Sequence, residues 1–318
     1  MKGPGGEAIL KNLQDKNMLE VYTYNAGKGD CVRLRFGDTH NIIIDTGVIR
    51  FASTFKRICD EITSAGETLD LLILTHVDDD HIGGILGNLR FGTYICPFHE
   101  VWMNYDCVTS ASDTNLSTRQ NNEVAARLIS RGVPIIPTLK GDKRAVAGAD
   151  IEVLWPETFD AGIEPRRDLP LAHHNDYRQS LSQLAEEPLR IHDRSRSNRN
   201  SIVFTFQFDD HRLLFTGDAW AEDVERATGY FDLVKLPHHG SVRNISDQYP
   251  SSFQASNFLI CTDGVNHPDK QTIAKLEKWY GEINVYSPAA WWNHGYFMND
   301  DRNHNVNYYQ KEGLVIAW

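Results

Sequence analysis

The alternation of apolar and polar side chains predicts an antiparallel meander of strands near the start of the chain. Residues 19–27 and 31–37 alternate along their length, and residues 41–47 form a short apolar run that ends at Gly47. The segment before residue 19 is polar and carries no such pattern. We therefore expect three neighbouring strands after a polar N-terminal tail.

Helical and strand patterns then follow one another. Residues 53–65 place apolar side chains at helical spacing behind Ser53, a plausible N-cap, and residues 69–76 form a continuous apolar strand. Strand 69–76 ends in His76 and opens into the glycine pair Gly83-Gly84, which we interpret as part of a turn. The further elements expected in this half are strands at 101–104, 133–136 and 150–154 and a helix over about 115–130.

The middle of the chain differs from its flanks. The stretch from 156 to 197 is polar and proline-bearing, and its one possible helix covers about 176–186, which predicts an insertion at about 157–197. Strand and helix patterns then resume at 201–208, 212–218, 220–228 (helix), 232–240 and 257–264, with short strands from 283 to the end. We expect one domain of mixed α/β (α+β) class over residues 1–318, with this insertion.

Composition and charge narrow the class of protein. With 41% hydrophobic and 24% charged residues in 318, the chain can bury a large core. Its 32 Lys and Arg face 43 Asp and Glu, so the formal net charge of -11 disfavours binding duplex DNA through a broad basic face. The five cysteines never form a CxxC pair, and no apolar run could span a bilayer. These features favour a cytoplasmic protein without a membrane partner.

The segment LTHVDDDHIGG, residues 74–84, is the strongest chemical signal in the chain. His76, Asp78, Asp80 and His81 follow directly on an apolar strand, where a turn can bring alternate side chains together. Imidazole and carboxylate ligands suit zinc, manganese and iron, and no thiolate selects zinc alone. The alternative, an acidic solvated loop, explains an isolated HxD better than it explains HxDxDH behind a buried strand. No phosphate loop, nucleophile elbow or GxGxxG motif competes.

THVDDDHIGG resembles the HxHxDH signature of the metallo-β-lactamase fold, with Asp78 at the position of the second histidine. This variant is similar to the ComEC-type competence-protein β-lactamase-like domain and to the phosphorylcholine esterases. Five further stretches resemble the family in the same order: NAGKGDC (25–31), IIIDTG (42–47), NRNSIVFTF (198–206), LLFTGD (213–218) and VKLPHHGS (234–241). Asn266-His267-Pro268 extends the series. The resemblance implies a four-layer αββα sandwich with a metal site at one edge.

The resemblance also implies two divalent ions, most simply zinc or manganese, that share a bridging aspartate and a hydroxide. Asp218 is the bridging residue on this basis. One ion would take His76, Asp78 and a further histidine, and the other would take Asp80, His81 and a late histidine, for which His267 is the candidate. The family's histidine between the signature and the bridging aspartate has no clear match, since His173, His174 and His192 lie in the insertion. His238 or His239 is expected to fill that position.

The two histidines of HHGS should point to opposite faces if the strand continues, so we favour His238 as a ligand. His239 would then contact substrate phosphate or act as general acid, alongside Asp80 in the catalytic machinery. Asp30 and Asp45 are expected in turns or as residues that orient His76 or His81. The residues expected to bind substrate are Asn198, Lys235, His239, Arg196 and Arg199, although a solvated basic loop is the alternative for the arginines and a surface lysine for Lys235.

These residues predict a metal-dependent hydrolase that cleaves phosphodiester bonds in DNA, RNA or a nucleotide. The resembling proteins act on phosphodiesters, and two aspartates harden the metal site toward phosphate oxygen. The alternatives are hydrolysis of a carboxylic ester, lactone or thioester, and a non-catalytic metal-binding partner module. The sequence leaves open the substrate, the native metal, endo or exo cleavage, oligomeric state and protein partners.

Overall fold

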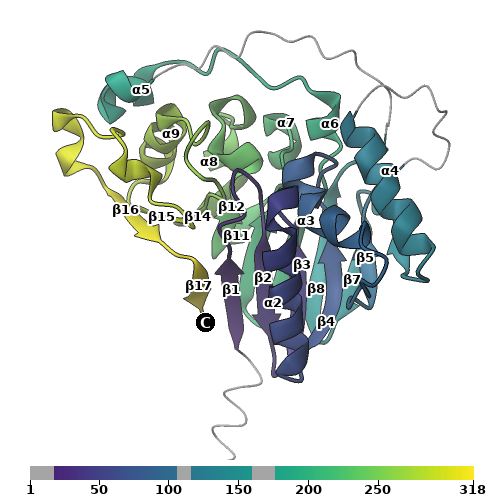
Figure 1. Ribbon diagram of the computed structural model, residues 1–318. Helices are drawn as coiled ribbons and strands as arrows, with labels where there is room; N and C mark the ends of the chain where they lie inside the picture. Colours follow the sequence, from purple (N-terminus) through teal and green to yellow (C-terminus); the bar gives the residue numbers. More distant parts are fainter. Residues whose placement is uncertain (1–17, 106–115, 160–175) are drawn as a thin grey trace, which may run out of the picture.

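The computed structural model describes residues 18–105, 116–159 and 176–318, so the expected N-terminal tail lies outside the described residues. Two large sheets face each other, and helices cover their outer faces (Figure 1). Among the described residues, no helix is both long and apolar enough to cross a bilayer.

The first sheet contains the expected N-terminal meander. Its strand order is β17-β1-β2-β3-β4-β5-β6, antiparallel from β17 to β3 and parallel from β3 to β6. Figure 1 shows the C-terminal strand β17 beside β1. The strands are β1 (Leu19–Thr23), β2 (Val32–Phe36), β3 (His40–Ile44), β4 (Thr68–Ile73), β5 (Glu100–Trp102), β6 (Ile135–Ile136) and β17 (Gly313–Ala317).

The second sheet consists of the hairpin β7–β8 from the first half of the chain and of strands from the second half. Its order is β16-β15-β14-β12-β10-β9-β8-β7, and β11 (Gly229–Phe231) pairs separately with β13 (Phe253–Ala255). The strands are β7 (Lys143–Val146), β8 (Ala149–Trp155), β9 (Val203–Phe208), β10 (His211–Phe215), β12 (Leu233–Lys235), β14 (Asn257–Leu259), β15 (Ile283–Ser287) and β16 (Val306–Gln310).

Three clusters of buried apolar side chains separate the four layers. The central cluster joins the inner faces of the sheets, with Phe36 from β2 packed edge-on against Phe206 from β9 at 5.4 Å between ring centroids. A second cluster lies between the first sheet and α2 (Ala52–Ser64), α3 (Asp79–Leu89) and α4 (Leu116–Ile129). A third lies between the second sheet and helices that include α5 (Leu181–Glu186) and α9 (Lys270–Tyr280). The predicted αββα sandwich is confirmed.

Two of the longer helices, and the short helices α6 and α8, were not predicted. The first, α3, contains Gly83 and Gly84, which were interpreted as a turn. A Cβ atom on Gly84 would lie 2.1 Å from the carbonyl oxygen of Thr46, so this glycine lets the helix approach the segment after β3. The second is α9, which begins just after His267. The short helices α6 (Arg196–Arg199), α7 (Ala221–Val224) and α8 (Tyr249–Ser252) complete the α-helices of the described ranges.

We expect Gly84→Ala to lower the free energy of unfolding by about 1–3 kcal/mol, because the added methyl group would push α3 away from Thr46. Helix propensity alone would favour alanine by about 1 kcal/mol, so a destabilisation isolates the steric effect. Gly92→Ala is the control, since a Cβ there would meet nothing within 4 Å. Urea unfolding of both variants measures the difference, and equal stability would contradict the close approach.

The described part of the expected insertion is held against the C-terminal half. A capping box between Ser180 and Gln183 begins α5, inside the range where one helix was expected. The buried ammonium of Lys270 pairs with Asp301 and donates to the carbonyl oxygen of Gln179 at 2.8 Å. These contacts join Gln179, within the expected insertion, to α9 and to the turn at Asn299–Asn303.

Candidate metal centre

The HxDxDH residues lie where β4 ends and α3 begins. Because the helix starts at Asp79, Asp80 and His81 sit in its first turn while His76 and Asp78 precede it. His76 and His81 are buried, and their rings meet edge-on at 5.2 Å. The Nε2 atom of His76 lies 3.3 Å from Oδ2 of Asp78, whose side chain is partly exposed. The motif therefore gathers its side chains at one strand end, as expected.

Asp218 follows β10 in the opposite sheet, and its carboxylate approaches His81 of the HxDxDH segment. Its Oδ1 atom lies 3.2 Å from Nε2 of His81, and its Oδ2 atom lies 3.8 Å from Nε2 of both His238 and His239. Nε2 of His239 is also 3.9 Å from Oδ2 of Asp80. His81, Asp218 and His239 thus offer ligand atoms that all lie within 4.8 Å of one another.

The backbone of the HHGS segment is not the extended strand that we expected. β12 ends at Lys235, and His238 and His239 lie in a tight turn with φ angles of 46° and 54°. Left-handed conformations at non-glycine residues cost on the order of 1–3 kcal/mol each and often mark functional sites. Because this backbone is not extended, the two rings are not directed to opposite faces, and both approach Asp218. The reason for preferring His238 as the single ligand therefore falls away.

The two histidines of HHGS have different surroundings. Nδ1 of His239 lies 3.0 Å from Asp30 and 2.9 Å from the carbonyl oxygen of Cys261, and the residue is buried. The side chain of His238 is 30% exposed, and its Nδ1 lies 3.3 Å from Nδ2 of Asn198 and 3.1 Å from Oδ1 of Asn244. His239 is the histidine that joins His81 and Asp218, whereas His238 reaches solvent.

His267 lies beside the centre, outside the cluster of His81, Asp218 and His239. Its ring centroid is 5.2 Å from that of His238 and 6.4 Å from that of His239, and its Nδ1 atom is 3.6 Å from Asp269. We expected His267 beside Asp80, but the HHGS turn brings His239 there instead. The position expected for His267 is the one that His239 approaches, so His267 as a ligand stays a prediction without a contact to support it.

Buried carboxylates orient two of these histidines. The Oδ2 atom of Asp45 lies 2.8 Å from Nδ1 of His81 and accepts the hydroxyl of Thr75 at 2.6 Å, while Oδ1 accepts the backbone N–H of Thr75 at 2.7 Å. Asp30 contacts Nδ1 of His239 in the same way. Since each Nδ1 faces acceptors, Nδ1 would carry the proton when a metal is bound, and each Nε2 would then offer its lone pair to the ion beside Asp218.

Lys235 differs from its expected role. The side chain is buried, and its ammonium contacts Asp30 and donates to the carbonyl oxygen of Gly217 at 3.0 Å, so it cannot reach a phosphate in solvent. Burial lowers the pKa of Lys235, but the carboxylates of Asp30 and Asp218 outweigh burial and raise it. Burial raises the pKa of Asp30, but Lys235 and His239 outweigh it and bring the pKa to about 2.

The other expected substrate-binding residues occupy α6 beside the centre. Asn198 is buried and donates to Asp193 at 2.6 Å while it contacts His238, so it lies near the site as expected. The guanidinium of Arg199 stacks on Trp220 at 4.7 Å and lies 3.8 Å from Asp223, and Arg196 is exposed. Substrate binding by Arg196 and Arg199 stays a prediction. His192 is exposed, and His173 and His174 lie outside the described residues.

Sequence reasoning missed Lys28, Asp193 and Asn244. The ammonium of Lys28 lies 2.9 Å from Oδ2 of Asp80, and Asp193 accepts from Asn198 and from Asn244, at 2.6 Å and 2.9 Å. A signal existed for Lys28, because the stretch NAGKGDC had been singled out as a whole. None existed for Asp193, because only the fold brings it to His238.

The residues fit a divalent metal ion. Buried ligand atoms without a hydrogen-bond partner gather here, namely Nε2 of His76, His81 and His239 and Oδ1 of Asp218. A buried polar atom left without a partner costs about 1–3 kcal/mol, and a bound cation removes that cost. Neutral imidazoles and carboxylates are the ligands that zinc, manganese and iron accept.

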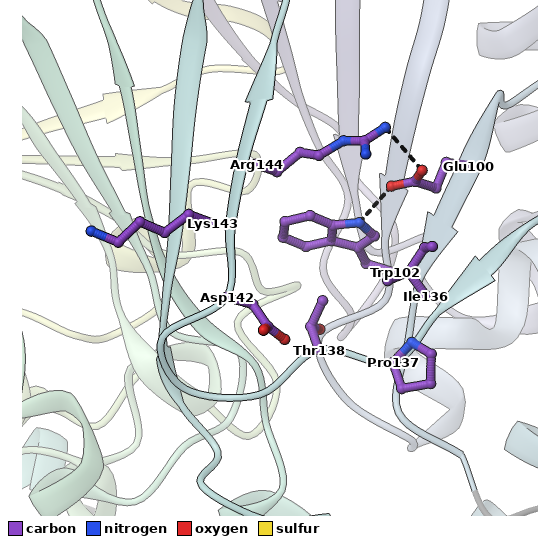
Figure 2. A pocket seen from close by; sticks show the side chains of 8 residues that line it. All are labelled: Glu100, Trp102, Ile136, Pro137, Thr138, Asp142, Lys143 and Arg144. Carbon is purple, nitrogen blue, oxygen red and sulfur yellow. Dashed lines mark hydrogen bonds and ion pairs between the residues drawn. The ribbon is translucent and has the colours of Figure 1, made fainter.

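A separate hollow of about 260 Å³ lies between the edges of the two sheets. Figure 2 shows Glu100 between the indole of Trp102 and the guanidinium of Arg144, at 2.7 Å and 2.9 Å. Lys143, another lining residue, pairs with Glu152. The charged groups that line this hollow are paired with one another or with neighbours, and none belongs to the metal centre.

One family model matches the part of the chain that contains the HxDxDH segment. The family model, described as the Metallo-beta-lactamase superfamily, matches residues 24–90, which include β2 to α3 and the HxDxDH segment. A search of the curated proteins finds no match.

Several solved structures are similar in overall arrangement. The metallo-β-lactamase fold protein YhfI from Bacillus subtilis is 12% identical with a TM-score of 0.44, covering 95% of this chain and 98% of YhfI. CmlA, a diiron β-hydroxylase from Streptomyces venezuelae, is 12% identical with a TM-score of 0.39, covering 90% of this chain and 48% of CmlA. Zn²⁺-bound PqqB from Methylobacterium extorquens is 11% identical with a TM-score of 0.37, covering 69% and 72%. The match shows that residues 24–90 are similar to the Metallo-beta-lactamase superfamily, and the described strands and helices form the αββα sandwich expected of that fold.

Proposed function

We propose that the chain is a metal-dependent phosphodiesterase that acts on nucleic acid or a nucleotide. The observation that carries the proposal is the convergence of three carboxylates, Asp78, Asp80 and Asp218, with the buried Nε2 atoms of His76, His81 and His239. Carboxylate ligands favour hard ions and oxygen-rich substrates over the softer chemistry of thiolate sites. The resemblance to the ComEC-type domain supports the same substrate class.

The proposed ligands form two groups that share Asp218. His76 and Asp78 would hold one ion, and Asp80, His81 and His239 would hold the other, with Asp218 shared. When bound, such ions would act as Lewis acids on phosphoryl oxygens and lower the pKa of a coordinated water. Zinc and manganese both suit this set of residues.

The surrounding side chains would orient the ligand histidines and protonate the leaving group. Asp45 and Asp30 keep the protons of His81 and His239 on Nδ1, which leaves each Nε2 free to act as a ligand. His238 is the partly exposed histidine at the centre, and Asn198 and Asn244 hold its ring. We assign His238 to the leaving group, to which it would pass a proton from Nε2.

A panel of substrates tests the proposal. Purified protein with manganese or zinc is assayed on labelled single-stranded DNA, duplex DNA, RNA, bis-p-nitrophenyl phosphate, a lactone and p-nitrophenyl acetate. We expect cleavage of a phosphodiester that Asp80→Ala abolishes, and the preferred polymer identifies the substrate class. Cleavage of the lactone or the acetate alone would support a carboxylic ester hydrolase instead. Metal binding with no turnover on any of them would support a binding module.

A further inference from the structure

The partly exposed side chain of Lys28 lies beside Asp80 at the metal centre. Its Nζ atom is 2.9 Å from Oδ2 of Asp80, and 48% of its side chain is exposed. A lysine ammonium carries three N–H donors, and the contact with Asp80 uses one of them. The other two remain for an oxygen atom that arrives from the solvent side.

The turn that carries Lys28 is fixed to the start of α3. The backbone N–H of Asp30 donates to the carbonyl oxygen of Asp80 at 3.1 Å. A Cβ atom on Gly29 would lie 2.0 Å from that same oxygen, so only glycine allows the turn to come this close. The backbone of Lys28 is therefore held at a constant distance from Asp80, unlike that of an ordinary surface lysine.

Three other basic groups near the centre have partners that are not proposed metal ligands. Lys235 is buried against Asp30, while Arg199 lies near Asp223 and stacks on Trp220. Arg194 pairs with Glu222 at 3.3 Å. Lys28 differs from them because its partner is itself a proposed ligand residue, and a divalent ion on Asp80 would take up part of the charge that now holds the ammonium.

We propose that Lys28 binds a negatively charged non-bridging oxygen of the substrate phosphodiester and thereby selects anionic over neutral esters. The inference rests on the proposed function, since it names a residue that recognises the same substrate. A charge-assisted hydrogen bond from an ammonium to a phosphoryl oxygen is stronger than one to a neutral carbonyl oxygen. The side chain thus supplies a preference that the ions alone do not.

The test measures binding separately from turnover. Dimethyl phosphate, an unreactive phosphodiester, is titrated by calorimetry into zinc-loaded wild type, Lys28→Gln, Lys28→Arg and the control Lys56→Gln, whose lysine is exposed on α2 and pairs only with Asp60. We expect Lys28→Gln to weaken binding about 10-fold or more, because it loses a charged hydrogen bond. Lys28→Arg should restore most of the affinity, and Lys56→Gln should not differ from wild type. Zinc content is measured for each variant.

Hydrolysis provides the second readout. On bis-p-nitrophenyl phosphate we expect Lys28→Gln to raise KM about 10-fold while kcat changes less, and any hydrolysis of p-nitrophenyl acetate should be unaffected. Unchanged dimethyl phosphate affinity in Lys28→Gln, or a wild type that does not bind it, would overturn the inference. A change in zinc content without a change in diester affinity would also overturn it, since Lys28 would then serve only Asp80. Binding that depends on Lys28 without hydrolysis would refute the proposed phosphodiesterase and leave the inference standing.

Discussion

Asp218→Asn is expected to lower phosphodiester hydrolysis by on the order of 10³-fold, which corresponds to the several kcal/mol that a metal centre supplies to a transition state. The carboxylate of Asp218 faces His81 through Oδ1 and both His238 and His239 through Oδ2. Asparagine keeps the shape but carries no charge, and its amide nitrogen cannot bind a cation. Both proposed ions would lose their shared ligand.

Metal content distinguishes this explanation from a folding defect. We expect Asp218→Asn to retain less zinc or manganese per chain after dialysis than wild type, with circular dichroism that shows an intact fold. Asp210→Asn, in the exposed turn between β9 and β10, is the control and should match wild type in both measurements. A chelator should remove activity from wild type, and added metal should restore it. Full activity in Asp218→Asn would exclude a bridging role.

The second large effect is expected from Lys235→Met, which should lower the free energy of unfolding by about 3–5 kcal/mol, because it leaves a buried carboxylate without its cation. Lys235 and Asp30 are each at most 3% exposed. Asp30 also contacts Nδ1 of His239. If Asp30 moves once Lys235 is lost, His239 should lose its orientation, and we expect metal binding to weaken by about 10–100-fold. Urea unfolding and metal titration measure the two effects.

A double variant separates the charge pair from the packing around it. Lys235→Met combined with Asp30→Asn removes both charges, and we expect it to be more stable than Lys235→Met alone, since no unpaired charge remains buried. Metal affinity should stay low, because the asparagine is a weaker acceptor for Nδ1 of His239. If Lys235→Met instead kept wild-type stability and raised only KM, Lys235 would bind substrate, as the sequence analysis expected.

The candidate site was predictable where its residues are neighbours in the sequence. His76, Asp78, Asp80 and His81 lie within six residues after an apolar strand, so local spacing alone brings them together. Asp30 and Asp45 were expected to orient His76 or His81, and this fits Asp45 but not Asp30, whose histidine partner is His239. The structure pairs Asp45 with His81 and Asp30 with His239.

Errors arose where backbone conformation depends on distant contacts. His238 and His239 follow an apolar strand pattern, but their backbone turns through left-handed angles that no periodicity indicates. Gly83 and Gly84 were interpreted as a turn but lie inside α3, where the missing Cβ atoms let the helix pass close to residues 46–49, more than thirty positions away in the sequence. Lys235 alternates like an exposed strand residue, yet its ammonium is buried against Asp30.

By itself, the sequence determined the mixed α/β class, most strands of both sheets and the chemical type of the metal ligands, because these depend on periodicity and residue identity over short distances. The tertiary structure alone decided that His239 rather than His267 approaches Asp80, that Lys235 is buried, and that the ammonium of Lys28 contacts Asp80. Each of these outcomes depends on which strand ends meet across the two sheets. Such meetings are set by packing of the whole core, which no local pattern encodes.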